Sequence, residues 1–74
     1  MITYPAFRSW LLWQAKTVHT TAAQQYLRAV EMLDANDADL TVIDDWAAAW
    51  SAVAPCDARD AAVEIKRASD RVLQ

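Results

Sequence analysis

No glycine occurs among the 74 residues of this chain, and this absence limits its possible folds more than any other feature. Tight β-hairpins favour Asn-Gly or Gly-X turns, and phosphate-binding loops need glycine where the backbone takes a positive φ close to the ligand. The chain is also rich in alanine and has only two prolines, a composition that favours helices. The sequence therefore predicts an all-α protein, and its length allows a single domain, residues 1–74.

A domain this small buries only roughly 60–65% of the surface that its unfolded chain exposes, so it needs a dense core or a partner. Cys56 is the only cysteine, which excludes an internal disulfide and fits a reducing compartment. The first residues lack the pattern of a signal peptide, and no stretch approaches the ~20 apolar residues of a membrane span. We expect a soluble protein in the cytoplasm, which is the bacterial host cytoplasm if a phage encodes it.

The first half of the chain contains two amphipathic segments. Pro5 suits the first position of a helix, and the helix is expected to end in the polar stretch 16–20. Its apolar face comprises Phe7, Trp10 and Leu11. A second helix is expected from Thr21, where Thr21 and Gln24 have the spacing of a capping box. The apolar face of this helix comprises Ala22, Tyr26, Val30 and Leu33.

The second half contains two more such segments. A third helix is expected to start at Thr41, with Asp44 as the capping partner, and to end at Pro55. Its apolar stripe comprises Ile43, Trp46, Ala47, Trp50 and Val53. A fourth helix is expected after Asp57 as N-cap. Its stripe comprises Ala58, Ala61, Ala62, Ile65, Ala68 and Val72. The four segments predict a compact bundle of four or five short helices.

Several phrases follow the pattern of a known family. These are the aromatic-rich residues 7–11, residues 26–33 with Tyr26 and Leu33, the opening of the third helix at 40–46, and the closing helix at 65–73. In these phrases the chain resembles the core-binding, SAM-like domain of tyrosine recombinases and phage integrases. The resemblance implies a SAM-like bundle that clamps DNA beside a separate catalytic domain. We expect that catalytic domain to be missing, so no catalytic residue is carried over and the chain is not an enzyme.

The charges are segregated along the chain, which has a net charge of −3. Three bases and no acid precede residue 30, whereas residues 31–45 hold six acids and no base. We call residues 31–45 the acidic segment. It has two interpretations: a solvated loop whose aspartates stabilise helix ends, or a surface that attracts a basic partner.

Two functional hypotheses follow from this distribution. In the first, a phage or mobile-element protein binds another protein, and Asp34, Asp37, Asp39, Asp44 and Asp45 contact a basic, nucleic-acid-binding partner. Trp13 would add an apolar anchor, unless it packs under a loop. Small inhibitors of host defence complexes, such as anti-CRISPR proteins, have this acidic, single-domain character.

The alternative, implied by the integrase resemblance, is a DNA-binding module in which Lys66, Arg67 and Arg71 contact phosphates. Glu64 and Asp70 are spaced to neutralise Arg67 and Lys66 locally, which argues against it. A third possibility is a homodimer that pairs through Leu12, Trp13 and the alanine side of the third helix.

Catalytic and metal sites are not expected. Cys56 and His19 lack a third group to orient them as a nucleophile and base. His19 is expected in a turn or cap, and Cys56 as a half-buried apolar residue. Residues 34–45 lack the central glycine and final glutamate of a calcium loop, and one His and one Cys are too few for zinc. No metal or cofactor is therefore expected.

Overall fold

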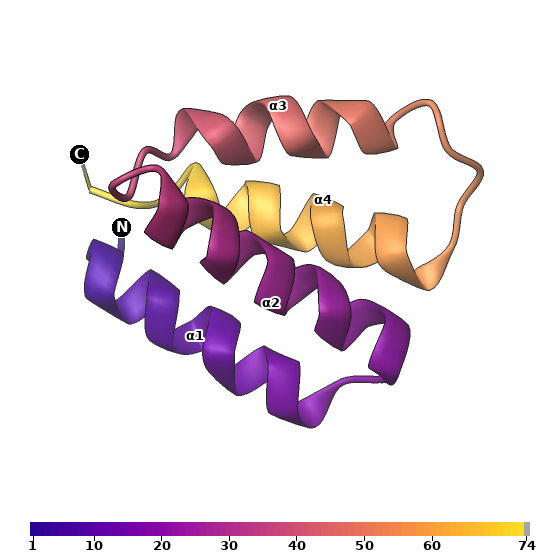
Figure 1. Cartoon of the computed structure of the whole chain (residues 1–74), viewed down its shortest axis with the longest axis horizontal. Coiled ribbons are helices and arrows are strands. Elements are labelled where there is room, and N and C mark those ends of the chain that lie inside the picture. The colour runs from indigo at the N-terminus through magenta and orange to yellow at the C-terminus, as the bar shows by residue number, and fades with distance from the viewer. Residues whose placement is uncertain (74) are drawn as a thin grey trace.

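The computed structural model describes residues 1–73 and shows four helices (Figure 1). They are α1 (Tyr4–Thr17), α2 (Thr20–Ala35), α3 (Thr41–Trp50) and α4 (Asp57–Ser69). The all-α prediction is confirmed, since no strand occurs among the described residues beyond one isolated bridge. α1 and α2 form an antiparallel hairpin, α4 packs against α2, and α3 covers α4 on the side away from α1.

The core lies where the apolar faces of the helices meet. Its fully buried large side chains are Phe7, Leu11, Leu33, Ile43 and Ile65. Ala58, Ala61 and Ala62 are also buried, and their small side chains let α4 pack closely on its neighbours. The predicted faces of α1, α2 and α4 are therefore confirmed, because helical periodicity places these residues on one side.

The two chain ends lie side by side (Figure 1). Ile2 and Val72 form a parallel bridge, in which the Ile2 N–H donates to the Arg71 carbonyl at 2.9 Å. The Leu73 N–H returns a bond to the Ile2 carbonyl at 2.8 Å. Val72 is buried as predicted, but it lies beyond the end of α4 and is held by this bridge.

The helix starts differ from the predicted ones. α1 begins one residue before Pro5, and the Thr3 hydroxyl accepts a hydrogen bond from the Ala6 N–H at 3.3 Å. α2 begins at Thr20 with His19 as its N-cap and without a side-chain capping bond. The capping box at Thr21 is therefore wrong, because Thr21 already lies inside the helix. The prediction of His19 as a cap residue is confirmed.

α3 is shorter than predicted. It ends at Trp50, well before Pro55, and Val53 is exposed rather than part of the core. Trp50 is only half-buried and lies outside the core cluster. The physical reason is that α3 lies at the edge of the bundle, against α4 and α2 alone. The apolar stripe of a single helix does not show how far the neighbouring helices extend along that helix.

Two further tryptophans lie at the border of the core. Trp10 and Trp46 are half-buried and pack against the core, as predicted. The Trp10 ring stacks on Phe7 and meets Tyr26 edge-on, with centroid separations of 6.2 Å and 5.5 Å.

Cys56 is exposed, so its predicted half-buried placement is wrong. It also takes the N-cap position of α4 that was predicted for Asp57, because α4 starts at Asp57 itself.

Candidate protein-binding surface

The acidic segment runs from the last turns of α2 through a tight turn into α3. The turn reverses the chain without glycine: Asp37 has φ 52° and Ala38 has φ 61°. The Ala38 N–H donates to the Leu33 carbonyl at 2.8 Å, the long bond of a Schellman motif. Asp37 therefore occupies the left-handed position that glycine usually fills, which aspartate tolerates better than most residues.

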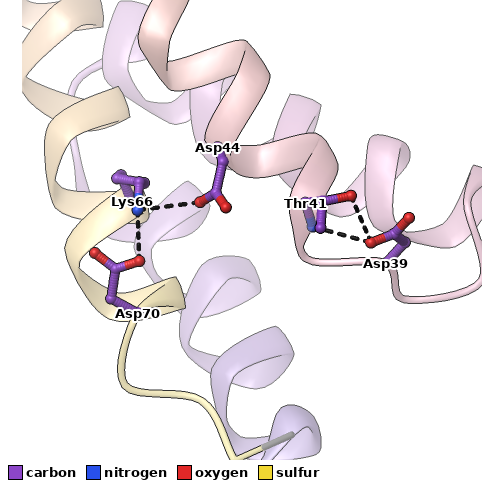
Figure 2. A network of polar contacts seen from close by, with 5 residues as sticks. All are labelled: Asp39, Thr41, Asp44, Lys66 and Asp70. Carbon is purple, nitrogen blue, oxygen red and sulfur yellow. Dashed lines mark hydrogen bonds and ion pairs between the residues drawn. The ribbon is translucent and has the colours of Figure 1, made fainter.

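Asp39 starts α3. Its carboxylate accepts hydrogen bonds from the Thr41 backbone N–H at 3.0 Å and from the Thr41 hydroxyl at 2.7 Å (Figure 2). These two bonds lower the pKa of Asp39 below its ordinary value. The predicted capping box between Thr41 and Asp44 is wrong, because Thr41 is the first helical residue and Leu40 precedes it as N-cap without a side-chain bond.

Asp34 is neutralised by the first helix. The Arg8 guanidinium donates from Nε to Asp34 Oδ1 at 3.1 Å and from Nη2 to Oδ2 at 2.9 Å. This two-point contact lowers the pKa of Asp34 and raises that of Arg8. Both side chains remain substantially exposed, so the pair holds α1 to the end of α2 without forming a buried charge.

Asp44 is neutralised by the last helix. Lys66 Nζ lies 3.1 Å from Asp44 Oδ1 and also bonds the carboxylate of Asp70 (Figure 2). The bonds to Asp70 and Asp44 raise the pKa of Lys66. The local pairing of Lys66 with Asp70 was predicted and is confirmed, and so is that of Arg67 with Glu64 at 3.5 Å. The link from Lys66 to Asp44 joins α4 to α3 and was not predicted.

The acidic segment is therefore divided into paired and unpaired carboxylates. Asp34 and Asp44 have ion pairs to other helices, and Glu31 lies 3.7 Å from Arg28. Asp37 and Asp45 are exposed and have no ion pair among residues 1–73, and Asp39 has only its bonds to Thr41. The unneutralised negative charge of this segment thus resides on three residues.

Trp13 lies elsewhere on the molecule. Its side chain is 59% exposed, on the outer face of α1, which resolves the choice between a loop-covered and an open tryptophan. The α2–α3 turn meets the start of α1 at one end of the bundle, whereas Trp13 belongs to the second half of α1 (Figure 1). The structure therefore does not combine Trp13 and the acidic turn into one compact patch.

The basic residues of the alternative hypothesis differ in how far acidic side chains neutralise them. Lys66 is held between Asp44 and Asp70, whereas Arg67 and Arg71 line a groove between α1 and α4 together with Trp10. Arg71 has no ion pair within the described part of the chain. Lys66 and Arg67 also line a second hollow, between α3 and α4, so each of the three bases lies beside another, but acids neutralise two of the three.

No family model, curated protein or solved structure matches this chain. Within residues 1–73, no helix combines the length and apolar character that crossing a membrane requires.

One pocket of the structure was not predicted from the sequence. An open pocket of about 560 Å³ lies between the α1–α2 turn and the first turns of α4. Asp57, Asp60 and Glu64 line it together with His19 and Tyr26. The spacing of the three acids, at i, i+3 and i+7, already placed them on one helix face. That spacing does not reveal that residues of the α1–α2 turn form the opposite wall of the pocket.

The Arg8–Asp34 pair yields a testable pH effect. Because the folded pKa of Asp34 is depressed, its pairing stabilises the fold above the unfolded pKa and is lost as the pH falls through the folded pKa. An NMR titration should place the midpoints of Asp34 and Asp39 below those of ordinary aspartates. Arg8→Gln should raise the midpoint of Asp34 and leave that of Asp39 unchanged. Equal shifts of both carboxyls would contradict the assigned causes.

Proposed function

We propose that this chain is a non-enzymatic binding protein that recognises a basic surface of another protein through its acidic segment. The observation that supports the proposal is the set of unneutralised carboxylates in this segment, Asp37 and Asp39 in the α2–α3 turn and Asp45 in the first half of α3. An excess of one charge at an exposed site speeds the encounter with a partner of opposite charge and disfavours like-charged ones.

Asp34 and Asp44 have a different part in this proposal. Their ion pairs with Arg8 and Lys66 fix the two ends of the acidic segment to α1 and α4. Asp37 and Asp39 thus lie on a turn that is anchored on both sides, and Asp45 lies on α3 next to the second anchor. A fixed surface loses less conformational entropy on binding than a mobile loop does.

The partner class that fits an acidic surface is a protein whose own surface is basic because it binds nucleic acid. Together with the resemblance to the SAM-like domain of phage integrases, this favours a phage or mobile-element protein that occupies such a surface, as an anti-CRISPR-like inhibitor of a host defence complex does. Trp13 offers a separate apolar contact on α1, for an extended partner or for a second copy of the chain.

The proposal is tested by affinity capture from a bacterial lysate followed by mass spectrometry. Wild type is compared with Asp37→Asn/Asp45→Asn, in which asparagine keeps the left-handed backbone at position 37. The control Gln24→Lys/Ala52→Lys changes the net charge equally at two exposed positions outside the segment. We expect the double asparagine variant to lose a nucleic-acid-binding protein that wild type and control both retain. Retention of the same proteins by all three would contradict the proposal.

DNA binding is the second candidate, favoured by the groove that Arg67, Arg71 and Trp10 share. Phosphate contacts weaken steeply with salt, so the test belongs at low salt. Fluorescence titration of a labelled duplex should show saturable binding at micromolar protein if this function holds, and Arg71→Gln should weaken it. The absence of binding under these conditions would eliminate the candidate.

A further inference from the structure

The open pocket beside α4 combines an apolar floor with an acidic rim. We call it the α4 pocket. Val18, Ala22 and Ala61 contribute apolar surface, and the carboxylates of Asp57, Asp60 and Glu64 lie along one side. No lysine or arginine lines it. The α1–α2 turn and the start of α4, whose residues line it, lie at the end of the bundle opposite the α2–α3 turn (Figure 1), so the pocket is distinct from the surface proposed above.

The rim carries a net negative charge. Asp57 and Asp60 have no ion pair within residues 1–73, and Glu64 has only the exposed contact with Arg67 at 3.5 Å. The N-terminus of α4 opposes them with a partial positive charge of roughly half a unit. Two or three carboxylates outweigh that partial charge, so the pocket favours a cation.

Tyr26 gives a second, independent sign of a ligand site. Its side chain lines the pocket and is only 5% exposed, and its hydroxyl has no hydrogen bond to another described residue. No buried side-chain polar atom of the described residues lacks a partner. The hydroxyl is therefore not sealed from solvent, and it belongs to a residue that lines the pocket.

The environment of Tyr26 keeps this hydroxyl protonated. Burial raises its pKa, and the negative charge of Glu64 raises it further. A neutral hydroxyl can accept a hydrogen bond from a ligand N–H. The pocket thus combines an apolar lining with a few polar groups, as small-ligand sites usually do.

The kind of cation follows from the spread of the carboxylates. No group of three or more His, Cys, Asp or Glu among residues 1–73 converges closely enough to hold a metal ion. A cation carried on an aliphatic chain fits better, because its methylene groups cover apolar surface while the charged head stays among carboxylates and water. We propose that the α4 pocket binds an alkyl guanidinium or alkyl ammonium group, from a basic side chain of a protein or from a free polyamine.

The test is a ¹H–¹⁵N NMR titration of the whole chain with agmatine, which carries both cationic groups on one short alkyl chain. We expect saturable shifts at the amides of Val18, His19 and Ala61, with a millimolar dissociation constant typical of so small a ligand. The neutral analogue 1-butanol should give at least fivefold weaker binding. Equal binding of 1-butanol, or shifts at the α2–α3 turn with the same midpoint as those at the pocket, would overturn the proposal.

Two variants and a control locate the site. Asp60→Asn removes one rim charge and should weaken agmatine binding about threefold or more, and Tyr26→Phe removes only the hydroxyl and should also weaken it. Asp37→Asn removes one charge at the other end of the bundle and should leave the binding unchanged. Weakening of binding by Asp37→Asn as large as that by Asp60→Asn would show general charge attraction and overturn the pocket assignment.

The two sources of the cation are separated by one more titration. The capped tripeptide Ala-Arg-Ala presents the same guanidinium on a peptide backbone. Tighter binding of the tripeptide than of agmatine would assign the pocket to a protein side chain. Tighter binding of agmatine would assign it to a free amine. Failure of both ligands to bind would overturn the proposal and leave the role of the acidic turn unaffected.

Discussion

Phe7→Ala is expected to destabilise the fold by about 3–5 kcal/mol, because it leaves a cavity in the centre of the core. Phe7 is fully buried and stacks on Trp10, which in turn packs edge-on against Tyr26. A chain of this length has a free energy of unfolding of roughly 4–11 kcal/mol in total. The substitution therefore removes a large part of the stability and should leave a substantial unfolded population near 37 °C.

Urea denaturation followed by circular dichroism measures this loss. Trp13→Ala is the matched control, since it also truncates an aromatic residue of α1, but one that is 59% exposed. The control should change the free energy of unfolding by no more than about 0.5 kcal/mol. Similar losses for both variants would mean that the aromatic core is not organised around Phe7.

The second large effect concerns α3. Ile43 is the only buried residue of this helix; its Val42 and Trp46 are only partly buried against the core, and Asp44 pairs with Lys66. Ile43→Ala should cost about 2–5 kcal/mol. Because α3 lies at the edge and contacts only α4 and α2, much of this loss should appear as local opening of α3 rather than as unfolding of the whole bundle.

Native-state hydrogen exchange distinguishes the two outcomes. A local loss of about 2 kcal/mol speeds exchange roughly 30-fold, and we expect this at the amides of α3 while those of α1 and α2 remain protected. Val53→Ala, just beyond the helix and exposed, serves as the control. Uniform acceleration in all four helices would show that α3 is not the weakly attached element. Opening of α3 would also release Asp44 and Asp45 from the acidic segment.

The helices could be predicted from the sequence because the residues that each one buries recur at helical spacing along its own segment. Phe7 with Leu11, and Tyr26 with Val30 and Leu33, lie on one helix face whatever the neighbours are. Alanine at positions 58, 61 and 62 likewise lies on the predicted apolar stripe, and the structure buries all three. The helix ends were harder to predict, because several residues near Thr21 and Thr41 could serve as N-caps. In the structure the N-caps are His19 and Leu40.

The candidate site was predicted in composition but not in pairing. The acidic segment is visible in the sequence, whereas the partners of Asp34 and Asp44 are Arg8 and Lys66, which lie far away along the chain. Only the packing of α1 on α2 and of α4 on α3 brings them together. The α4 pocket was missed for the same reason, since its two walls come from different helices.

The central claim is that the unpaired carboxylates of the acidic segment attract a basic partner. Its most direct test is calorimetric titration of the captured partner with wild type and Asp37→Asn/Asp45→Asn, at about 0.05 M and about 0.5 M salt, where screening differs strongly. We predict that salt weakens wild-type binding at least tenfold, and that each removed charge weakens low-salt binding roughly 2- to 5-fold. Equal affinities of the two proteins, unchanged by salt, would contradict the claim.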